Sequence, residues 1–156
     1  MYRRNYILTR QIIMQLTQQI IDHFKFEEGY KTHAYLDTEG YYTVGYGHML
    51  GRDPSYADVV WTDEECLAAL ATDLDSSNNG VHNIFEDYDA YSDGVQLALL
   101  DMCYELGEHG LSGFHLFIRY VKARDWETAA TEALDSLWAR EVPHRAKRDT
   151  DLIASG

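Results

Sequence analysis

The segment that most constrains the fold is residues 27–48, which read EEGYKTHAYLDTEGYYTVGYGH. Glu28 ends an apolar-periodic run and is followed directly by Gly29. Glycine is the usual residue just past a helix, because it adopts positive φ at little cost. The rest of the segment is rich in aromatic and β-branched residues on both sides of Asp-Thr-Glu-Gly at 37–40, a composition typical of a β-hairpin. We therefore predict a helix that ends at Glu28, followed by a hairpin with strands at 34–36 and 41–44.

Two carboxylates and a hydroxyl are brought together by this arrangement. Glu28 ends the helix, Asp37 lies in the turn, and Thr43 lies on the returning strand. Glycoside hydrolysis uses such a pair, because one carboxylic acid protonates the leaving oxygen and a second carboxylate acts at the other face of the sugar. The alternative is that the three side chains only cap a helix and a turn, which is the commoner role for a single Asp or Thr. The combination and its spacing favour the catalytic interpretation.

The order and spacing of these residues resemble those of the bacteriophage lysozymes of glycoside hydrolase family 24. The resemblance covers roughly residues 17–148, most of the chain. It is carried by residues 28–29, 37–43, 45–48, 107–108, 113–114, Trp126, Trp138 and 143–148. It implies an α+β, predominantly helical fold of two lobes, in which a helix connects a small β-hairpin lobe to a helical C-terminal lobe.

The expected organisation is one lysozyme-like domain over residues 1–156. Its parts are an N-terminal helical extension at 1–16, the hairpin lobe at 29–61, the bridging helix at 62–84 and the helical lobe at 85–156. Apolar residues recur every four positions before Glu28, which predicts a first helix from about residue 5. Thr62 and Glu65 have the spacing of a capping box, which marks the start of the bridging helix.

Further elements follow from apolar periodicity and from glycine and proline positions. Residues 49–61 are expected to be a connection. A buried helix should begin at Ser92 or Asp93 and end at Gly107 and Gly110. The remaining expected elements are helices at about 114–123, 126–134 and 137–141, and a final basic turn from Pro143.

The resemblance also implies roles for individual residues. Glu28 is the general acid, Asp37 positions or activates a water molecule, and Thr43 holds that water, so that the β-1,4 bond of bacterial peptidoglycan is hydrolysed with inversion. Substrate contacts are implied for Met49, Tyr104, Phe117 and Glu132. Supporting roles are implied for His48 paired with Asp73, and for Glu105 and Arg145 near the acid. Neither a metal nor a cofactor is expected, since the histidines and cysteines lack metal-ligand spacing.

Two other functions remain open at this stage. Phe117, Glu132 and Glu105 differ from the small or neutral side chains that the resemblance leads us to expect. These differences are compatible with a peptidoglycan-binding protein that has lost turnover, or with a glycosidase acting on chitin oligomers.

Charge limits the possible partners. The net charge is −13, and residues 53–116 contain fourteen Asp and Glu but neither Lys nor Arg. Because phosphate binding needs a basic surface, nucleic acid is not an expected partner. Neither a membrane-spanning apolar run nor a secretory signal is evident, since polar residues interrupt the segment after Arg3 and Arg4. We expect a monomer that stays in the host cytoplasm until it is released to the peptidoglycan glycan strands.

The chain has two cysteines, too few for a disulfide framework. Cys66 and Cys103 each lie on an apolar stretch of an expected helix. This position favours two buried small hydrophobic residues over a bridge or a nucleophile.

Overall fold

The computed structural model describes residues 17–156. The chain divides into two compact units, and the division falls between Asp75 and Ser76, inside helix α3. The extension expected at 1–16 lies outside the described residues. The prediction of one helix from about residue 5 to Glu28 is wrong at its start: helix α2 (Gln18–Glu28) begins after Thr17, which has extended backbone angles and caps the helix by accepting a hydrogen bond from the Ile20 N–H.

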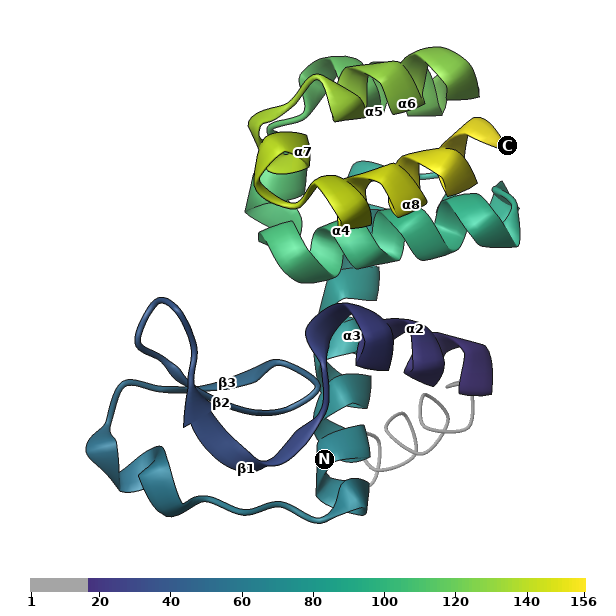
Figure 1. Cartoon of the computed structure of the whole chain (residues 1–156). Coiled ribbons are helices and arrows are strands. Elements are labelled where there is room, and N and C mark those ends of the chain that lie inside the picture. The colour runs from purple at the N-terminus through teal and green to yellow at the C-terminus, as the bar shows by residue number, and fades with distance from the viewer. Residues whose placement is uncertain (1–16) are drawn as a thin grey trace. The chain divides into compact units, whose positions relative to one another are not determined.

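The first unit begins with helix α2 (Gln18–Glu28), which ends at Glu28 as predicted. Three short antiparallel strands follow in the order β1-β2-β3 (Figure 1). Their bounds are Lys31–Leu36 for β1, Tyr42–Gly45 for β2 and His48–Gly51 for β3. Together with the helices described below, this sheet confirms the α+β, predominantly helical class.

Strand β3 lies where the sequence predicts only a connection, so that part of the prediction is wrong. Gly45 and Gly47 both have positive φ, at 68° and 77°. Glycine adopts this conformation without a steric penalty, and the chain therefore reverses direction within two residues. The short reversal allows His48 to pair with Val44, and the hairpin gains a third strand.

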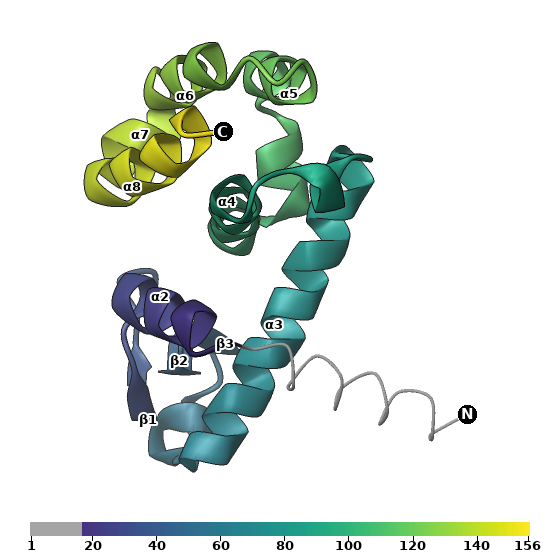
Figure 2. The same ribbon diagram turned by 90° about the vertical axis from the view of Figure 1, so that its right-hand side faces the viewer.

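A 3₁₀ helix, η1 (Pro54–Asp58), precedes helix α3 (Asp63–Ile84). The capping box at the start of α3 is confirmed. The Thr62 N–H donates to Glu65 Oε2 at 2.8 Å, and the Glu65 N–H donates to Thr62 Oγ1 at 3.2 Å. The first half of α3 lies beside the sheet (Figure 2), and a Cβ atom at Gly45 would lie only 3.4 Å from Cys66 Sγ.

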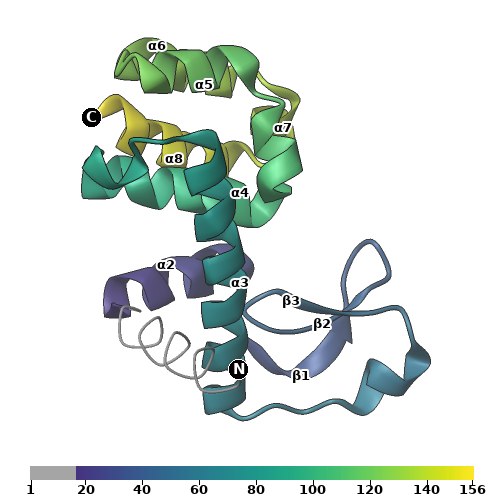
Figure 3. The same ribbon diagram turned by 180° about the vertical axis from the view of Figure 1, so that it is seen from behind.

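The second unit is helical (Figure 3). Ser92 caps α4, as expected, and Gly107 interrupts this helix with non-helical backbone angles before it continues to Ser112. The predicted final turn is wrong in extent, because Pro143 begins a helix of 12 residues. The bounds are Tyr88–Ala90 for the 3₁₀ helix η2, Asp93–Ser112 for α4, His115–Lys122 for α5, Trp126–Leu134 for α6, Leu137–Glu141 for α7 and Pro143–Ala154 for α8.

Helix α8 is longer than predicted because its apolar side is buried against other helices, which stabilises it along its whole length. It packs against both α4 and α6, and Ala146 and Ile153 are completely buried. Its other positions are largely charged, so the sequence alone shows only a weak apolar pattern. The core around it contains Phe85, Leu99, Met102, Phe117 and Val121 among its largest side chains.

Both cysteines are free and buried, as predicted. Burial raises the pKa of the Cys66 thiol, and it raises that of Cys103 to about 11. Thiols that stay protonated at neutral pH are poor nucleophiles, which supports a packing role for both residues.

Across residues 17–156, the helices are too short or too polar to span a membrane.

Candidate functional site

The carboxyl group of Glu28 lies against the turn between β2 and β3. Glu28 is half-buried at the end of α2, and Gly29 continues the chain with a φ of 75°. A Cβ atom at Gly47 would lie 3.0 Å from Glu28 Oε2 and 3.3 Å from Glu28 Cβ. The backbone of the turn therefore approaches Glu28 so closely that a larger residue at position 47 would displace the carboxyl group.

Asp37 is held by the turn in which it lies. Its Oδ1 atom accepts hydrogen bonds from the N–H groups of Glu39 at 2.9 Å and Tyr41 at 2.8 Å. The backbone of the turn is closed by a bond from the Asp37 N–H to the Tyr41 carbonyl at 2.8 Å. These contacts involve only Oδ1, so Oδ2 is directed to a different neighbour.

That neighbour is Thr43. Its Oγ1 atom lies 3.5 Å from Asp37 Oδ2, which is long for a hydrogen bond, and the residue is only 5% exposed. A buried hydroxyl beside a carboxylate oxygen can bind a water molecule together with that oxygen. The structure thus brings together Asp37 and Thr43 within the same unit as Glu28.

Tyr35 is a neighbour of this group that the sequence analysis did not single out. It pairs with Thr43 across β1 and β2. Burial, followed by the negative charges of Glu28 and Asp37, raises the pKa of the Tyr35 hydroxyl, so its phenol lies within the field of both carboxylates. The Lys31 ammonium lies 4.0 Å from the ring centroid of Tyr35. The sequence contains a signal for Tyr35: side chains alternate between the two faces of a strand, so residues 35 and 37 are expected on the same face.

His48 and Asp73 form the pair expected from the sequence. His48 Nδ1 lies 2.8 Å from Asp73 Oδ2, which connects β3 to α3. The centroid of the imidazole ring also lies 5.3 Å from that of the Trp61 ring. Both contacts of His48 therefore hold neighbouring parts of the first unit together, which is a structural role. Met49, the next residue on β3, is 53% exposed.

In the second unit, Arg145 is the centre of a buried ionic network. It donates from Nη2 to Asp101 Oδ1 at 2.6 Å and from Nε to Asp101 Oδ2 at 3.0 Å. Its Nε lies 3.2 Å from Glu105 Oε2, which also accepts a hydrogen bond from Trp138 Nε1 at 2.9 Å. Asp101 is not among the predicted site residues, although an Asp within a strongly apolar helix is a signal that the sequence contains. The proximity of Glu105 and Arg145 to Glu28 stays a prediction.

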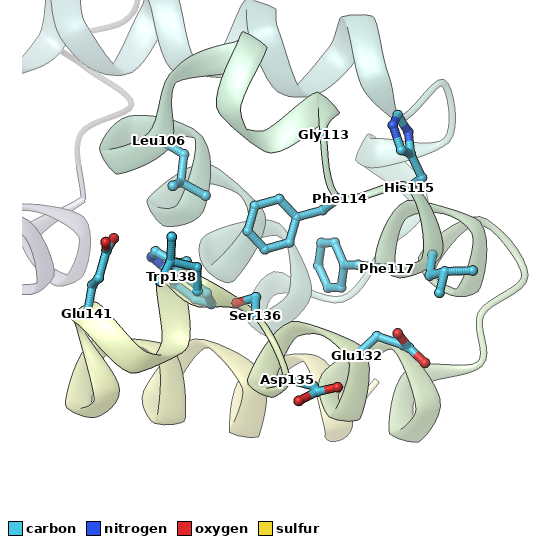
Figure 4. A pocket seen from close by; sticks show the side chains of 12 residues that line it. Leu106, Gly113, Phe114, His115, Phe117, Glu132, Asp135, Ser136, Trp138 and Glu141 are labelled. Atoms are coloured by element: carbon cyan, nitrogen blue, oxygen red, sulfur yellow. The ribbon is translucent and has the colours of Figure 1, made fainter.

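The remaining residues for which substrate contacts are expected lie on three helices of the second unit. Tyr104 is half-buried on α4. Phe117 on α5 is 2% exposed and belongs to the core, whereas Glu132 on α6 is half-buried. Phe117 and Glu132 both line a pocket of about 560 Å³ (Figure 4). Only the part of the Phe117 ring that faces this pocket is available for contact.

The sequence of the chain is similar to those of known proteins. The family model described as phage lysozyme matches residues 25–147. A probable T4-type lysozyme of Dictyostelium discoideum is 26% identical, covering 90% of this chain and 96% of that protein. An endolysin of Bacillus phage B103 is 32% identical over 78% of this chain and 45% of its own length. The pre-baseplate central spike protein Gp5 of Enterobacteria phage T4 is 28% identical over 83% of this chain, but over only 26% of that protein.

The matched segment includes Glu28, Asp37 and Thr43, and it spans both compact units. The chain therefore belongs to the phage lysozyme family and is a glycoside hydrolase.

Proposed function

We propose that this lysozyme hydrolyses the β-1,4 bond between N-acetylmuramic acid and N-acetylglucosamine in bacterial peptidoglycan, with inversion at the anomeric carbon. The observation that carries the proposal is the contact of 3.5 Å between Thr43 Oγ1 and Asp37 Oδ2, in the same unit as the half-buried Glu28. Together these residues offer one proton donor and one water-binding pair, which are the groups that an inverting glycosidase needs.

Glu28 is the general acid in this proposal. Its carboxyl group donates a proton to the glycosidic oxygen as the bond to the anomeric carbon breaks. The close approach of Gly47 supports this role, because a proton donor must be held in a fixed position relative to the leaving oxygen.

Asp37 and Thr43 bind and orient the attacking water molecule. The carboxylate of Asp37 accepts a proton from the water, and the Thr43 hydroxyl fixes the position of the water oxygen. The hydrogen bonds from Glu39 and Tyr41 to Oδ1 support this assignment, because they leave Oδ2 as the oxygen that faces Thr43.

The other predicted residues have secondary roles in the proposal. Met49, Tyr104, Phe117 and Glu132 contact the sugars, and Phe117 is the most buried of the four. His48, Asp73, Glu105 and Arg145 hold elements of the fold in place through their ion pairs. The enzyme acts as a monomer on peptidoglycan glycan strands and remains in the host cytoplasm before release.

The test is the release of soluble fragments from purified peptidoglycan by wild type and by Glu28→Gln. An amide has no proton to donate, so we expect the rate to fall by about 10²–10⁴-fold. Glu39→Gln, an exposed carboxylate in the same hairpin turn, is the matched control and should retain the rate. Nuclear magnetic resonance of the first product should show the α-anomer.

Three results would contradict the proposal. An unchanged rate for a folded Glu28→Gln variant would remove Glu28 from the chemistry. A β-anomer as first product would exclude inversion. A higher rate on chitin oligomers than on peptidoglycan would assign a different substrate.

A further inference from the structure

Every lysine and arginine of residues 17–75, the described part of the first unit, lies over a tyrosine ring. These residues include three basic side chains and twelve Asp and Glu. The distances to the ring centroids are 5.1 Å from Lys25 Nζ to Tyr30, 4.0 Å from Lys31 Nζ to Tyr35 and 4.1 Å from Arg52 Cζ to Tyr41. Within residues 17–156, none of the three basic side chains forms an ion pair with a carboxylate.

A tyrosine ring orders a cation without neutralising it. The face of the ring attracts the cation through its quadrupole but carries no net charge. A carboxylate partner would instead cancel the charge of the cation. The three basic side chains therefore keep their full charge, although most ionisable groups around them are acidic, and this charge is available to an anion from outside the chain.

Two of the three rings lie on the face of the hairpin that carries Thr43. Tyr35 on β1 is directly opposite Thr43 on β2 (Figure 1). Tyr41 precedes Thr43 by two residues, and its carbonyl continues the pairing by accepting the bond from the Asp37 N–H. Residues directly opposite each other, and residues two apart along a strand, project to the same side of a sheet. Both rings therefore flank the hydroxyl that contacts Asp37.

The cations held by these two rings are exposed and lie close to the same turn. Lys31 is the first residue of β1, and its ammonium group lies over the ring of Tyr35. Arg52 follows β3, and its Nη2 donates to the carbonyl of Glu39 at 3.4 Å, within the turn that contains Asp37. Two positive charges with exposed side chains thus accompany the proposed water-binding pair.

The third cation has the same chemistry in a different place. Lys25 lies on α2, and the ring of Tyr30 beneath it contacts Tyr46 with a centroid separation of 4.8 Å. These three residues line a separate pocket of about 240 Å³ whose lining includes neither Asp37 nor Thr43. Lys25 is therefore a matched reference for the two cations of the hairpin.

We propose that Lys31 and Arg52 bind carboxylate groups of the substrate beside Asp37 and Thr43, and so make the enzyme selective for a charged glycan. The inference rests on the proposed function and adds which part of the substrate is recognised. Peptidoglycan carries carboxylates on its peptides or on its lactyl groups, whereas chitin oligomers carry none. With a net charge of −13, the protein repels such a substrate at long range. At contact distance, lysine and arginine offset this repulsion by forming charge-assisted hydrogen bonds with carboxylates.

The test compares soluble peptidoglycan fragments with the same fragments after chemical amidation of their carboxylates. The variants are Lys31→Gln and Arg52→Gln, and Lys25→Gln is the control, since each removes one exposed positive charge from above a tyrosine ring. The release of reducing ends gives kcat and KM. Fluorescence anisotropy with labelled fragments gives Kd without requiring turnover.

We expect Lys31→Gln and Arg52→Gln each to raise KM and Kd for native fragments by about tenfold, with little change in kcat, because a contact with the bound substrate is lost. On amidated fragments the two variants and wild type should share the same raised values. Lys25→Gln should match wild type on both substrates. Lys31→Arg and Arg52→Lys keep the charge and should restore most of the affinity.

Fragments whose peptides have been removed by an amidase distinguish the two sources of carboxylate, because only the lactyl carboxylates remain. An effect of the variants that persists on these fragments assigns the lactyl group, and an effect that disappears assigns the peptides.

Three outcomes would overturn the proposal. An equal loss of affinity in Lys25→Gln would mean a general effect of positive charge. An equal loss on native and amidated fragments would mean that the two residues only support the hairpin. Equal affinity of wild type for native and amidated fragments would exclude recognition of carboxylates. If wild type releases no reducing ends, the proposed function fails, whereas the comparison by anisotropy still decides this inference.

Discussion

Gly47 determines how closely the β2–β3 turn approaches the Glu28 carboxyl group. Its φ is 77°, and a Cβ atom there would lie 3.0 Å from Glu28 Oε2. Two separate requirements therefore act on one residue. The backbone needs a residue that tolerates positive φ, and the carboxyl group needs a residue without a side chain.

Gly47→Ala should reduce activity by more than its effect on stability explains. The methyl group must displace the Glu28 side chain, and a misplacement of about 1 Å can lower a catalytic rate by about 10²-fold. The matched control is Gly107→Ala, at a φ of 71° with nothing within 4 Å of the new Cβ atom. We expect both variants to lose about 1–2 kcal/mol of unfolding free energy in urea, because alanine is strained at positive φ.

Activity on peptidoglycan is then measured at a temperature where both variants are folded. If Gly47→Ala retains the rate of Gly107→Ala, the close approach does not position Glu28.

The sequence is informative about candidate site residues that lie close together along the chain. Glu28, Asp37 and Thr43 lie on a helix end, a turn and a strand whose local signals can be recognised. Asp101 and Tyr35 were missed for a different reason. The pairing of Asp101 with Arg145 joins residues 44 positions apart, and the effect of Tyr35 depends on burial and on charges that only the folded chain brings near it.

At the level of elements, helix α3 continues through a segment with poor helix propensity. Residues 76–80 read Ser-Ser-Asn-Asn-Gly, yet α3 extends to Ile84. Gly80 is completely surrounded: a Cβ atom there would lie 3.0 Å from both Cys103 Sγ and Glu108 Cβ on α4. Packing against α4 therefore stabilises the helix at the position where its intrinsic propensity is lowest.

Gly80→Ala should destabilise the protein, although alanine is the better helix former by about 1 kcal/mol. The new methyl group overpacks the contact with Cys103, which is buried, and overpacking typically costs about 1–3 kcal/mol. Asn79→Ala, an exposed position one residue earlier, should be stabilising by a few tenths of a kcal/mol, since only propensity acts there.

Urea unfolding of the two variants measures both effects. A stabilised Gly80→Ala variant would show that α3 and α4 separate at little cost.

At the scale of the whole molecule, charge is distributed unevenly along the chain. The net charge is −13, and residues 53–116 lack both Lys and Arg. Such an excess of one sign destabilises the compact state through self-repulsion. It also removes electrostatic attraction to anionic cell-wall polymers.

The temperature of thermal unfolding should rise when salt is added. Between 0.01 M and 0.1 M NaCl the Debye length falls from about 30 Å to about 10 Å, so repulsion between distant carboxylates is screened. We expect an increase of about 2–4 °C, the change that about 1 kcal/mol produces in a chain of this size. Calorimetry measures it, and Asp58→Asn/Glu64→Gln, which removes two exposed charges, should show a smaller increase. If the unfolding temperature stays constant or falls as salt is added, charge repulsion does not limit the stability of the protein.

By itself, the sequence determined the local elements of this protein: the end of α2 at Glu28, the Asp37 turn, the capping box at Thr62 and Glu65, and helices α5 to α7. These features depend on hydrogen bonds and backbone angles within a few residues, and so their signals are local.

Tertiary structure decided the third strand, the length of α8 and the partners of Arg145. It also decided how closely Gly47 and Gly80 are packed. Each of these depends on burial or on contacts between residues distant in sequence, because packing free energy is set by neighbours that propensity and periodicity do not specify.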